Sequence, residues 1–182
     1  DNSDPLHVTH GNPSLKAAYS QNFRLMGRNT RLGLSGDVNF SNTYNSQTQA
    51  VFYNLATGGT ETYPVNVNGN WNMRAIFAIR SDGRNGSISP LAGANFSQSV
   101  ALVNEGKSEE PDRSVTHNTS YNANLRLGYQ PKWGGFDLQG DWRYRHATNQ
   151  LRGTSNYTRS YNFSLNTYAE LPLGFQVKSD VA

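Results

Sequence analysis

The sequence has no cysteine and no long hydrophobic run. Without cysteine, the chain can form neither disulfides nor thiolate-ligated metal sites. No stretch of about 18 consecutive apolar residues occurs, which excludes a membrane-spanning helix. Hydrophobic residues make up only 35% of the 182 residues, and the mean hydropathy is -0.70. A transmembrane β-barrel and a soluble β-sandwich both permit this average, because each carries apolar side chains at alternate strand positions.

A strong charge of either sign is also lacking. Lys and Arg together number 16 and Asp and Glu 13, which gives a formal net charge of +3. The arginines are scattered singly, so the sequence carries no electrostatic footprint for nucleic acid. No basic-plus-apolar leader precedes Asp1. We therefore expect that a signal peptide has been removed or that the chain is part of a longer protein.

Strict alternation of apolar and polar residues is clearest between residues 115 and 152. The apolar set comprises Tyr121, Ala123, Leu125, Leu127, Tyr129, Phe136, Leu138, Trp142 and Tyr144. The polar set comprises Asn122, Asn124, Arg126, Asp137, Gln139, Asp141, Arg143 and Arg145. Successive side chains of a strand point to opposite faces, so this stretch predicts two long strands joined by a turn at residues 131–135.

The same two-residue alternation predicts further strands elsewhere in the chain, and no segment has the pattern of a helix. The further predicted strands span residues 19–28, 31–44, 70–80, 88–103 and 157–171, and a last one begins at Phe175. In residues 45–70 the apolar residues do not keep to one set of alternate positions, and Thr57-Gly58-Gly59-Thr60 predicts a hairpin tip there. We interpret this segment as a hairpin standing clear of the main sheet, or as a structured loop. The predicted fold is all-β, an antiparallel up-and-down meander of about eight long strands.

The connections between these strands alternate in length. Those at residues 29–30, 81–86, 131–135 and 172–174 are short, whereas those at 45–70, at 104–114 and around Gly153 are expected to be mostly longer and more polar. Short turns at one end and long loops at the other are typical of outer-membrane barrels. Tyr121 and Tyr129 also bracket an aliphatic band whose eight residues, tilted by about 40°, span about 20 Å of the membrane normal.

A motif near the start of the chain adds a resemblance to a known family. Asp4-Pro5-Leu6 followed by Gly11-Asn12-Pro13-Ser14-Leu15-Lys16 resembles a segment of TonB-dependent outer-membrane receptor barrels, in the outer-membrane β-barrel family related to the glycan-importing receptors. Ala17-Ala18 stands where those barrels usually have Pro-Glu. Residues 63–69 and 170–175 resemble a strand entry and a turn of the same barrels, so the resemblance covers nearly the whole chain.

The resemblance implies a fold and a function. Residues 1–182 would be a slice of a larger barrel without its plug domain, with residues 45–70 extracellular; closure into an eight-stranded barrel is the alternative. The whole protein would import a nutrient of the glycan or metal-chelate class across the cell outer membrane. The implied partners are membrane lipid, the rest of the barrel and its plug, the TonB system and a surface lipoprotein, with no nucleic acid.

Two sets of residues are candidates for a functional site. The possible lumen-wall charges are Arg126, Asp137, Asp141, Arg143 and Arg145. They would pair with a plug or steer solute, or else form ordinary cross-strand ion pairs that each contribute less than about 1 kcal/mol. The possible extracellular contacts are the aromatic residues Tyr44, Phe52, Tyr53 and Tyr63, which would stack on a sugar or pack a hairpin against its neighbours.

Catalytic and metal sites have little support in the sequence. His7 and His10 are three residues apart, but no third ligand is evident beyond the nearby Asp4, so polar loop residues are the favoured interpretation. No Ser-His-Asp arrangement, nucleotide-binding glycine loop or pair of carboxylates in a cleft stands out. We expect no enzyme activity, no cofactor and no metal.

One rival interpretation is open at this point: a soluble or secreted β-sandwich that binds carbohydrate through aromatic loops. It predicts a common core that buries Leu125, Leu127, Trp142 and Phe163. A membrane barrel predicts instead that these side chains are exposed when no lipid is present. The exposure of Leu125 and Trp142 therefore separates the two folds.

Overall fold

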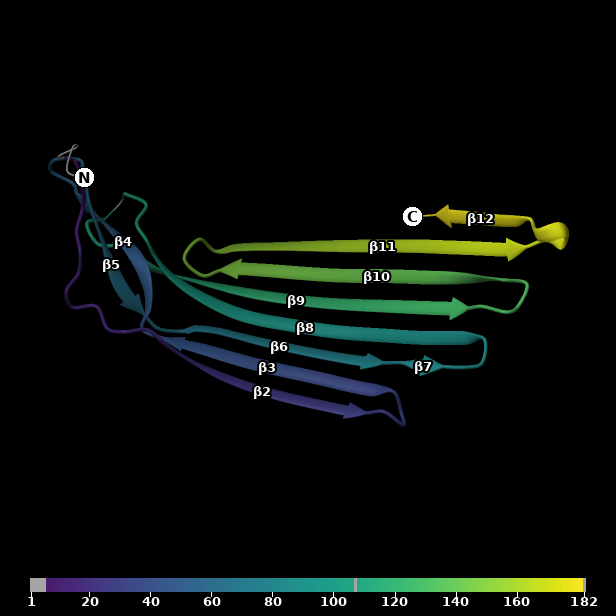
Figure 1. The fold of residues 1–182 in the computed structure, drawn as a ribbon. Helices are drawn as coiled ribbons and strands as arrows, with labels where there is room; N and C mark the ends of the chain where they lie inside the picture. Colours follow the sequence, from purple (N-terminus) through teal and green to yellow (C-terminus); the bar gives the residue numbers. More distant parts are fainter. Residues whose placement is uncertain (1–5, 107, 182) are drawn as a thin grey trace.

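Long antiparallel strands dominate the computed structural model, which describes residues 6–106 and 108–181. The strands of the large sheet are β2 (Tyr19–Asn29), β3 (Leu34–Tyr44), β6 (Asn70–Ile79), β7 (Ser81–Asp82), β8 (Gly86–Val103), β9 (Asp112–Tyr129), β10 (Gly134–Asn149), β11 (Thr154–Glu170) and β12 (Gln176–Val181). Each long strand pairs with the next one along the chain (Figure 1). The predicted all-β antiparallel meander is confirmed.

Helix is nearly absent from the described residues. They contain one short 3-10 turn, Pro172–Gly174, and no helix long and apolar enough to cross a membrane. The Asp4-Pro5 part of the motif, and Lys107 in the predicted loop at 104–114, lie outside the described residues.

The register of the large sheet separates an apolar face from a polar face. Ala92, Ala123, Trp142 and Tyr161 form one row of directly facing residues across β8, β9, β10 and β11. In the adjacent row stand Gly93, Asn122, Arg143 and Ser160. A slip of one residue in any pairing would mix the two sets, so the alternation seen along each strand also fixes the register between strands.

No second layer covers the apolar face in the described part of the chain. Leu125 is 41% exposed, Trp142 36% and Phe163 56%. A sandwich would bury these side chains against a second sheet. The rival interpretation as a soluble β-sandwich is therefore wrong, and the apolar face is left for another apolar medium.

A smaller sheet lies at one end of the large one. β4 (Ser46–Asn54) and β5 (Gly59–Val67) form a hairpin, and β1 (His7–Thr9) pairs with β5 in parallel. Val67 at the hairpin base packs with Val100 and Val115 in the one buried apolar cluster that the described residues form. Residues 45–70 thus hold a hairpin with a sheet of its own, but its base is packed against the large sheet and does not stand clear of it.

The connections differ in length at the two ends of the sheet, with one exception. Residues 30–33, 83–85, 130–133 and 171–175 connect strands at one end, and the hairpin and residues 104–111 lie at the other. The expectation of a longer loop around Gly153 is wrong, because residues 150–153 form a four-residue turn. Asn149 Oδ1 accepts the Arg152 N–H at 2.9 Å, and Gly153 has a φ of +59°, which together close the turn tightly.

Some strand boundaries also differ from those predicted. β3 begins later than predicted, at Leu34, whereas β8 and β11 begin earlier, at Gly86 and Thr154. The extra residues of β8 and β11 are small or polar, and backbone pairing includes them although they add nothing to the apolar period.

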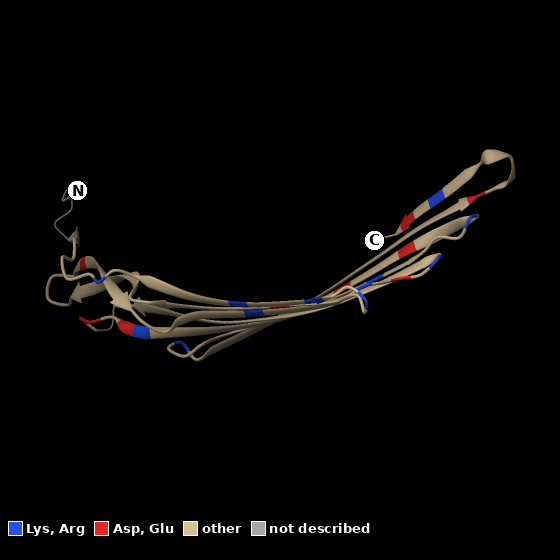
Figure 2. Ribbon diagram, turned by 60° about the horizontal axis from the view of Figure 1, so that its bottom comes forward, with Lys and Arg blue, Asp and Glu red and all other residues tan. Residues whose placement is uncertain are grey.

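The large sheet is open and curved. β2 and β12 occupy its two edges and do not pair with each other, so the described strands do not close into an eight-stranded barrel. Viewed from a second direction, the sheet is a single curved layer through most of its length, with Lys, Arg, Asp and Glu spread along the strands (Figure 2).

Gly33 provides a test of the turn end of the sheet. Its φ is +64°, and an added Cβ would lie 1.8 Å from the Arg80 carbonyl oxygen. Gly33→Ala should lower the free energy of unfolding by about 1–3 kcal/mol, because it combines a left-handed backbone with a backbone clash. The measurement is the urea midpoint of the full-length protein in lipid vesicles. Gly140→Ala is the matched control, since nothing lies within 4 Å of its Cβ position; equal midpoints for the two variants would contradict the geometry.

Candidate functional site

The five predicted lumen-wall charges all lie on the polar face of β9 and β10. Arg126 Nε donates to Asp137 Oδ2 at 2.9 Å. Asp141 accepts from Asn124 Nδ2 at 2.7 Å and from Gln139 Nε2 at 3.2 Å. Both acidic side chains are thus hydrogen-bonded to neighbouring side chains of the same face. With the Arg126 side chain 60% exposed, the ion pair contributes less than about 1 kcal/mol, so it orders these two side chains more than it stabilises the fold.

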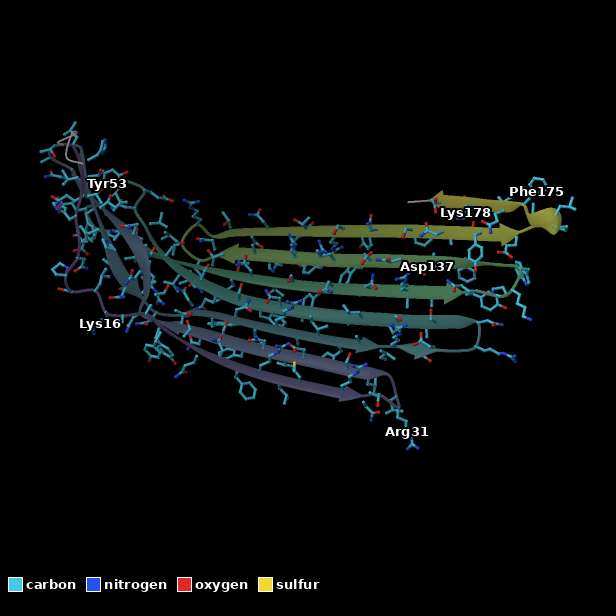
Figure 3. The ribbon with its side chains drawn as sticks, viewed as in Figure 1. Lys16, Arg31, Tyr53, Asp137, Phe175 and Lys178 are labelled. Carbon is cyan, nitrogen blue, oxygen red and sulfur yellow. The ribbon has the colours of Figure 1, made fainter. Side chains whose placement is uncertain are left out.

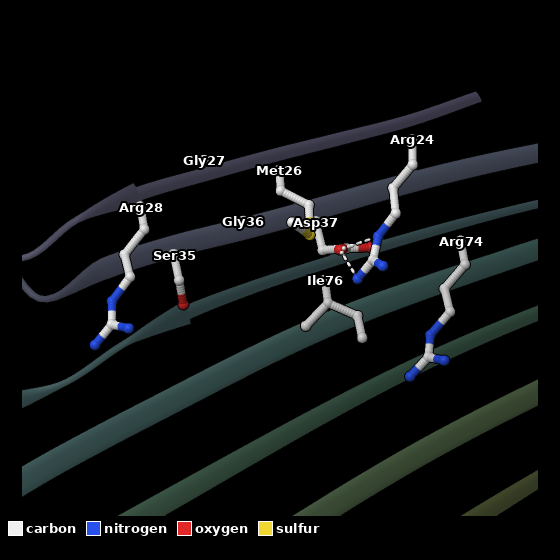
Figure 4. A pocket seen from close by; sticks show the side chains of 9 residues that line it. All are labelled: Arg24, Met26, Gly27, Arg28, Ser35, Gly36, Asp37, Arg74 and Ile76. Carbon is white, nitrogen blue, oxygen red and sulfur yellow. Dashed lines mark hydrogen bonds and ion pairs between the residues drawn. The ribbon is translucent and has the colours of Figure 1, made fainter.

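A second charged group on the same face escaped the sequence analysis. Arg24 on β2 donates through Nε and Nη2 to Asp37 Oδ2 on β3, at 2.8 and 2.6 Å. Together with Met26, Arg28 and Arg74 this pair lines a shallow depression open to solvent (Figure 4). Asp37 and Arg74 belong to the polar sets of their own strands, so the alternation already contained the signal that would have included them.

The register brings three arginines into one row across the polar face. Arg145, Ser120, Asn95, Arg74, Asn39 and Arg24 face one another in order from β10 to β2. Arg74 and Arg145, like Arg143 in the next row, have no carboxylate partner among the described residues. This basic row favours negatively charged groups, whether on a solute or on another part of the protein. The hydrogen-bonded Asp137 lies near the short turns (Figure 3), and the register places Asp141 on the same side of the basic row.

The four candidate aromatic residues do not form one cluster. The rings of Phe52 and Tyr63 stack within the hairpin, with centroids 4.6 Å apart. Tyr53 lies on the opposite face of β4, near Gly106, and its backbone N–H donates to the Glu109 carbonyl at 3.0 Å. Tyr53 is therefore at the hairpin end of the molecule, between the hairpin and the loop at 104–111 (Figure 3).

Tyr44 is placed differently from the other three. It ends β3 on the apolar face and stacks on Tyr19, with ring centroids 4.8 Å apart. The structure thus places Tyr44 with the aromatic residues that border the apolar face. That these residues contact a solute stays a prediction, and the position of Tyr44 on the apolar face does not favour such a contact for that residue.

Aromatic rows border the apolar face at two levels. Tyr121 lies 5.7 Å from Phe96 and 6.2 Å from Tyr144 between ring centroids, and Tyr129 lies 6.0 Å from Phe136. These two levels match the predicted spacing of Tyr121 and Tyr129. Aromatic side chains in such rows occupy the two membrane interfaces of outer-membrane barrels, with the aliphatic band between them in hydrocarbon.

The histidines near the start of the chain bind neighbouring side chains. His7 Nδ1 lies 2.7 Å from Thr60 Oγ1, and His10 Nε2 lies 3.9 Å from Glu61 Oε2. No group of three His, Asp or Glu side chains that could hold a metal ion occurs in the described part of the chain.

These features define a transmembrane β-barrel protein: long antiparallel strands, one apolar face bordered by aromatic rows, and one polar face that carries hydrogen-bonded charges and arginines. A model of the outer membrane protein beta-barrel family matches residues 1–169. The chain therefore belongs to the outer membrane protein beta-barrel family, and it lies in the outer membrane. Neither the curated proteins nor the solved structures gave a match.

The absence of native cysteine in this chain allows a direct test of the two faces. Asn122 and Ala123 are adjacent on β9 and point to opposite faces. In membranes that contain the full-length protein with any other cysteine replaced, a charged maleimide should label Asn122→Cys at least several-fold faster than Ala123→Cys, because thiolate forms in water and not in hydrocarbon. Equal labelling of the two positions would overturn the assignment of the faces.

Proposed function

We propose that this chain forms part of the barrel wall of a TonB-dependent receptor that imports a nutrient of the glycan or metal-chelate class. The observation that carries the proposal is the continuous polar face, combined with the Gly-Asn-Pro motif at Gly11-Asn12-Pro13. Ion pairs and arginines without partners need water beside them. A wall of this kind therefore faces a wide aqueous lumen.

Two features of the sheet support a lumen wider than that of an eight-stranded barrel. An eight-stranded barrel has an interior just wide enough to be filled by side chains. Here the Arg24 and Arg126 side chains are each 60% exposed, and β2 and β12 do not pair with each other. Because unpaired strand edges are too costly in lipid, further strands must cover both edges. Barrels of about 22 strands, whose lumen holds a plug, meet both requirements.

The two ends of the sheet have different roles in this proposal. The short turns face the periplasm, and the hairpin and the loop at 104–111 face the cell exterior, where solute and a surface lipoprotein would meet them. The apolar face contacts membrane lipid. The polar face contacts the plug, through which the TonB system supplies energy. The proposal includes no catalytic step, no cofactor and no nucleic acid.

Uptake by the native bacterium tests this function. Deleting the gene for the full-length protein should abolish growth on one oligosaccharide or one metal chelate while leaving growth on the free sugar or metal salt unchanged. The reason is that a bulky solute needs an energised receptor, whereas a small one crosses through general porins. Loss of TonB should give the same phenotype as the deletion.

A pore without energy coupling would contradict the proposal. The purified full-length protein should show no steady conductance in planar bilayers, because its plug would fill the lumen. A stable open-channel conductance, together with uptake that survives the loss of TonB, would identify a passive porin instead.

The hairpin aromatic residues provide a narrower prediction. Tyr53→Ala should weaken the binding of the imported solute to the full-length receptor several-fold, since Tyr53 lies at the loop end of the molecule. Tyr44→Ala should leave the solute Kd unchanged, because Tyr44 stacks on Tyr19 at the apolar face. Isothermal titration calorimetry measures both. A larger loss for Tyr44→Ala than for Tyr53→Ala would place the solute elsewhere.

A further inference from the structure

An arginine on an inner strand of the sheet lies on the face that contacts lipid. Arg159 on β11 lies directly opposite Tyr144 on β10, in the apolar set that continues to Tyr161, Phe163 and Leu165. It is exposed, and it is the one charged residue on this face of β11. On the lipid face of a barrel, arginine is strongly unfavourable at the membrane midplane and tolerated only near an interface. Its position therefore needs a reason.

The depth of Arg159 is that of an interface. Register places it in the row of Tyr144 and Tyr121, eight residues along β9 from the second aromatic level at Tyr129. That separation corresponds to about 20 Å of membrane normal. In the orientation proposed above, on which this inference rests, the end with the long connections faces the cell exterior, and Arg159 is then at the level of the outer-leaflet headgroups.

The surroundings of Arg159 hold its guanidinium and leave its hydrogen-bond donors free. Its Cζ lies 5.7 Å from the ring centroids of both Tyr144 and Tyr157. Rings on two sides orient the planar group by cation–π contact and consume none of its N–H donors. In the next rows outward, His146 and Ser155 are hydrogen-bonded to each other at 2.8 Å on the same face.

Among the described strands of the large sheet, no acidic side chain shares a face with this arginine. The strand residues that share the apolar face from β2 to β12 include no Asp or Glu. The other strand arginine of the face, Arg113, lies at the start of β9 and donates to the Asn68 carbonyl at the hairpin base. An oriented guanidinium without a carboxylate, at headgroup depth, matches a phosphate, to which arginine binds with two parallel hydrogen bonds.

We propose that Arg159, framed by Tyr144 and Tyr157, binds a phosphate group of an outer-leaflet glycolipid. The membrane itself brings this ligand to the site, because the face is turned toward lipid and a soluble protein cannot reach it. The rings of Tyr144 and Tyr157 would contact the glycolipid where its sugars join the acyl chains. His146 and Ser155, which lie further outward, would add polar contacts to the headgroup. The site is separate from the lumen and independent of any transported solute.

Native mass spectrometry of the delipidated full-length protein in detergent tests this site, with no solute and no TonB present. Titration with a phosphorylated outer-leaflet glycolipid should give a Kd that is roughly tenfold higher for Arg159→Gln, the size expected for a lost charge-assisted contact. The glycolipid Kd of Arg159→Lys should lie between those of the unmodified protein and Arg159→Gln, because lysine keeps the charge but lacks the planar guanidinium. A heat-modifiable gel shift confirms that each variant is folded.

Arg145→Gln is the matched control. Arg145 lies directly opposite Thr158, the neighbour of Arg159. The substitution Arg145→Gln therefore removes the same charge at nearly the same depth, but on the opposite face of the sheet. Its glycolipid Kd should be unchanged. An equal loss in both variants, or no loss in Arg159→Gln, would overturn the proposal. Displacement of the glycolipid by millimolar inorganic phosphate, or equal binding of a phosphatidylethanolamine, would also overturn it, since the ligand would then be a free anion or any phospholipid.

Discussion

Backbone hydrogen bonding is the constraint on which the rest of this structure depends. In lipid, an unpaired N–H or C=O group has no water to bond, so each must be paired with a neighbouring strand. This requirement produces strands of 16 to 18 residues in β8, β9, β10 and β11, in continuous register. Continuous register then extends the alternation within each strand over the whole sheet. The two faces, one for lipid and one for water, result from backbone pairing between strands combined with the two-residue alternation of side chains along each strand.

Because the period is visible in one strand at a time, most of the fold could be predicted from the sequence. Alternation along each strand was enough to predict the face on which each charged residue of β9 and β10 lies, and the register between the strands brings these residues together on that face. What could not be predicted depends on contacts between distant residues. The packing of Val67 on Val100 and Val115 joins segments far apart in sequence. The short turn at 150–153 depends on one side-chain acceptor, Asn149, and one left-handed glycine.

For the candidate site, too, the sequence of each strand predicts the face of a residue but not its neighbours on other strands. Parity places Arg145 on the polar face, but only the register across six strands shows that it lies in a row with Arg74 and Arg24. Sequence proximity grouped Tyr44 with Phe52, although Tyr44 ends a strand of the large sheet and Phe52 belongs to the hairpin. Aromatic residues serve both membrane interfaces and loop packing, so their type alone could not separate these locations.

Arg145 and Arg159 show how one residue type acquires two functions from the medium around it. They stand at the same depth on opposite faces of β10 and β11. On the polar face water solvates the guanidinium, and Arg145 needs no partner and contributes to a diffuse basic row. On the lipid face water is scarce, so Arg159 requires aromatic rings to orient it and a fixed anion to balance its charge. A sheet one strand thick therefore separates an arginine that water solvates from an arginine that, in our proposal, binds a fixed anion.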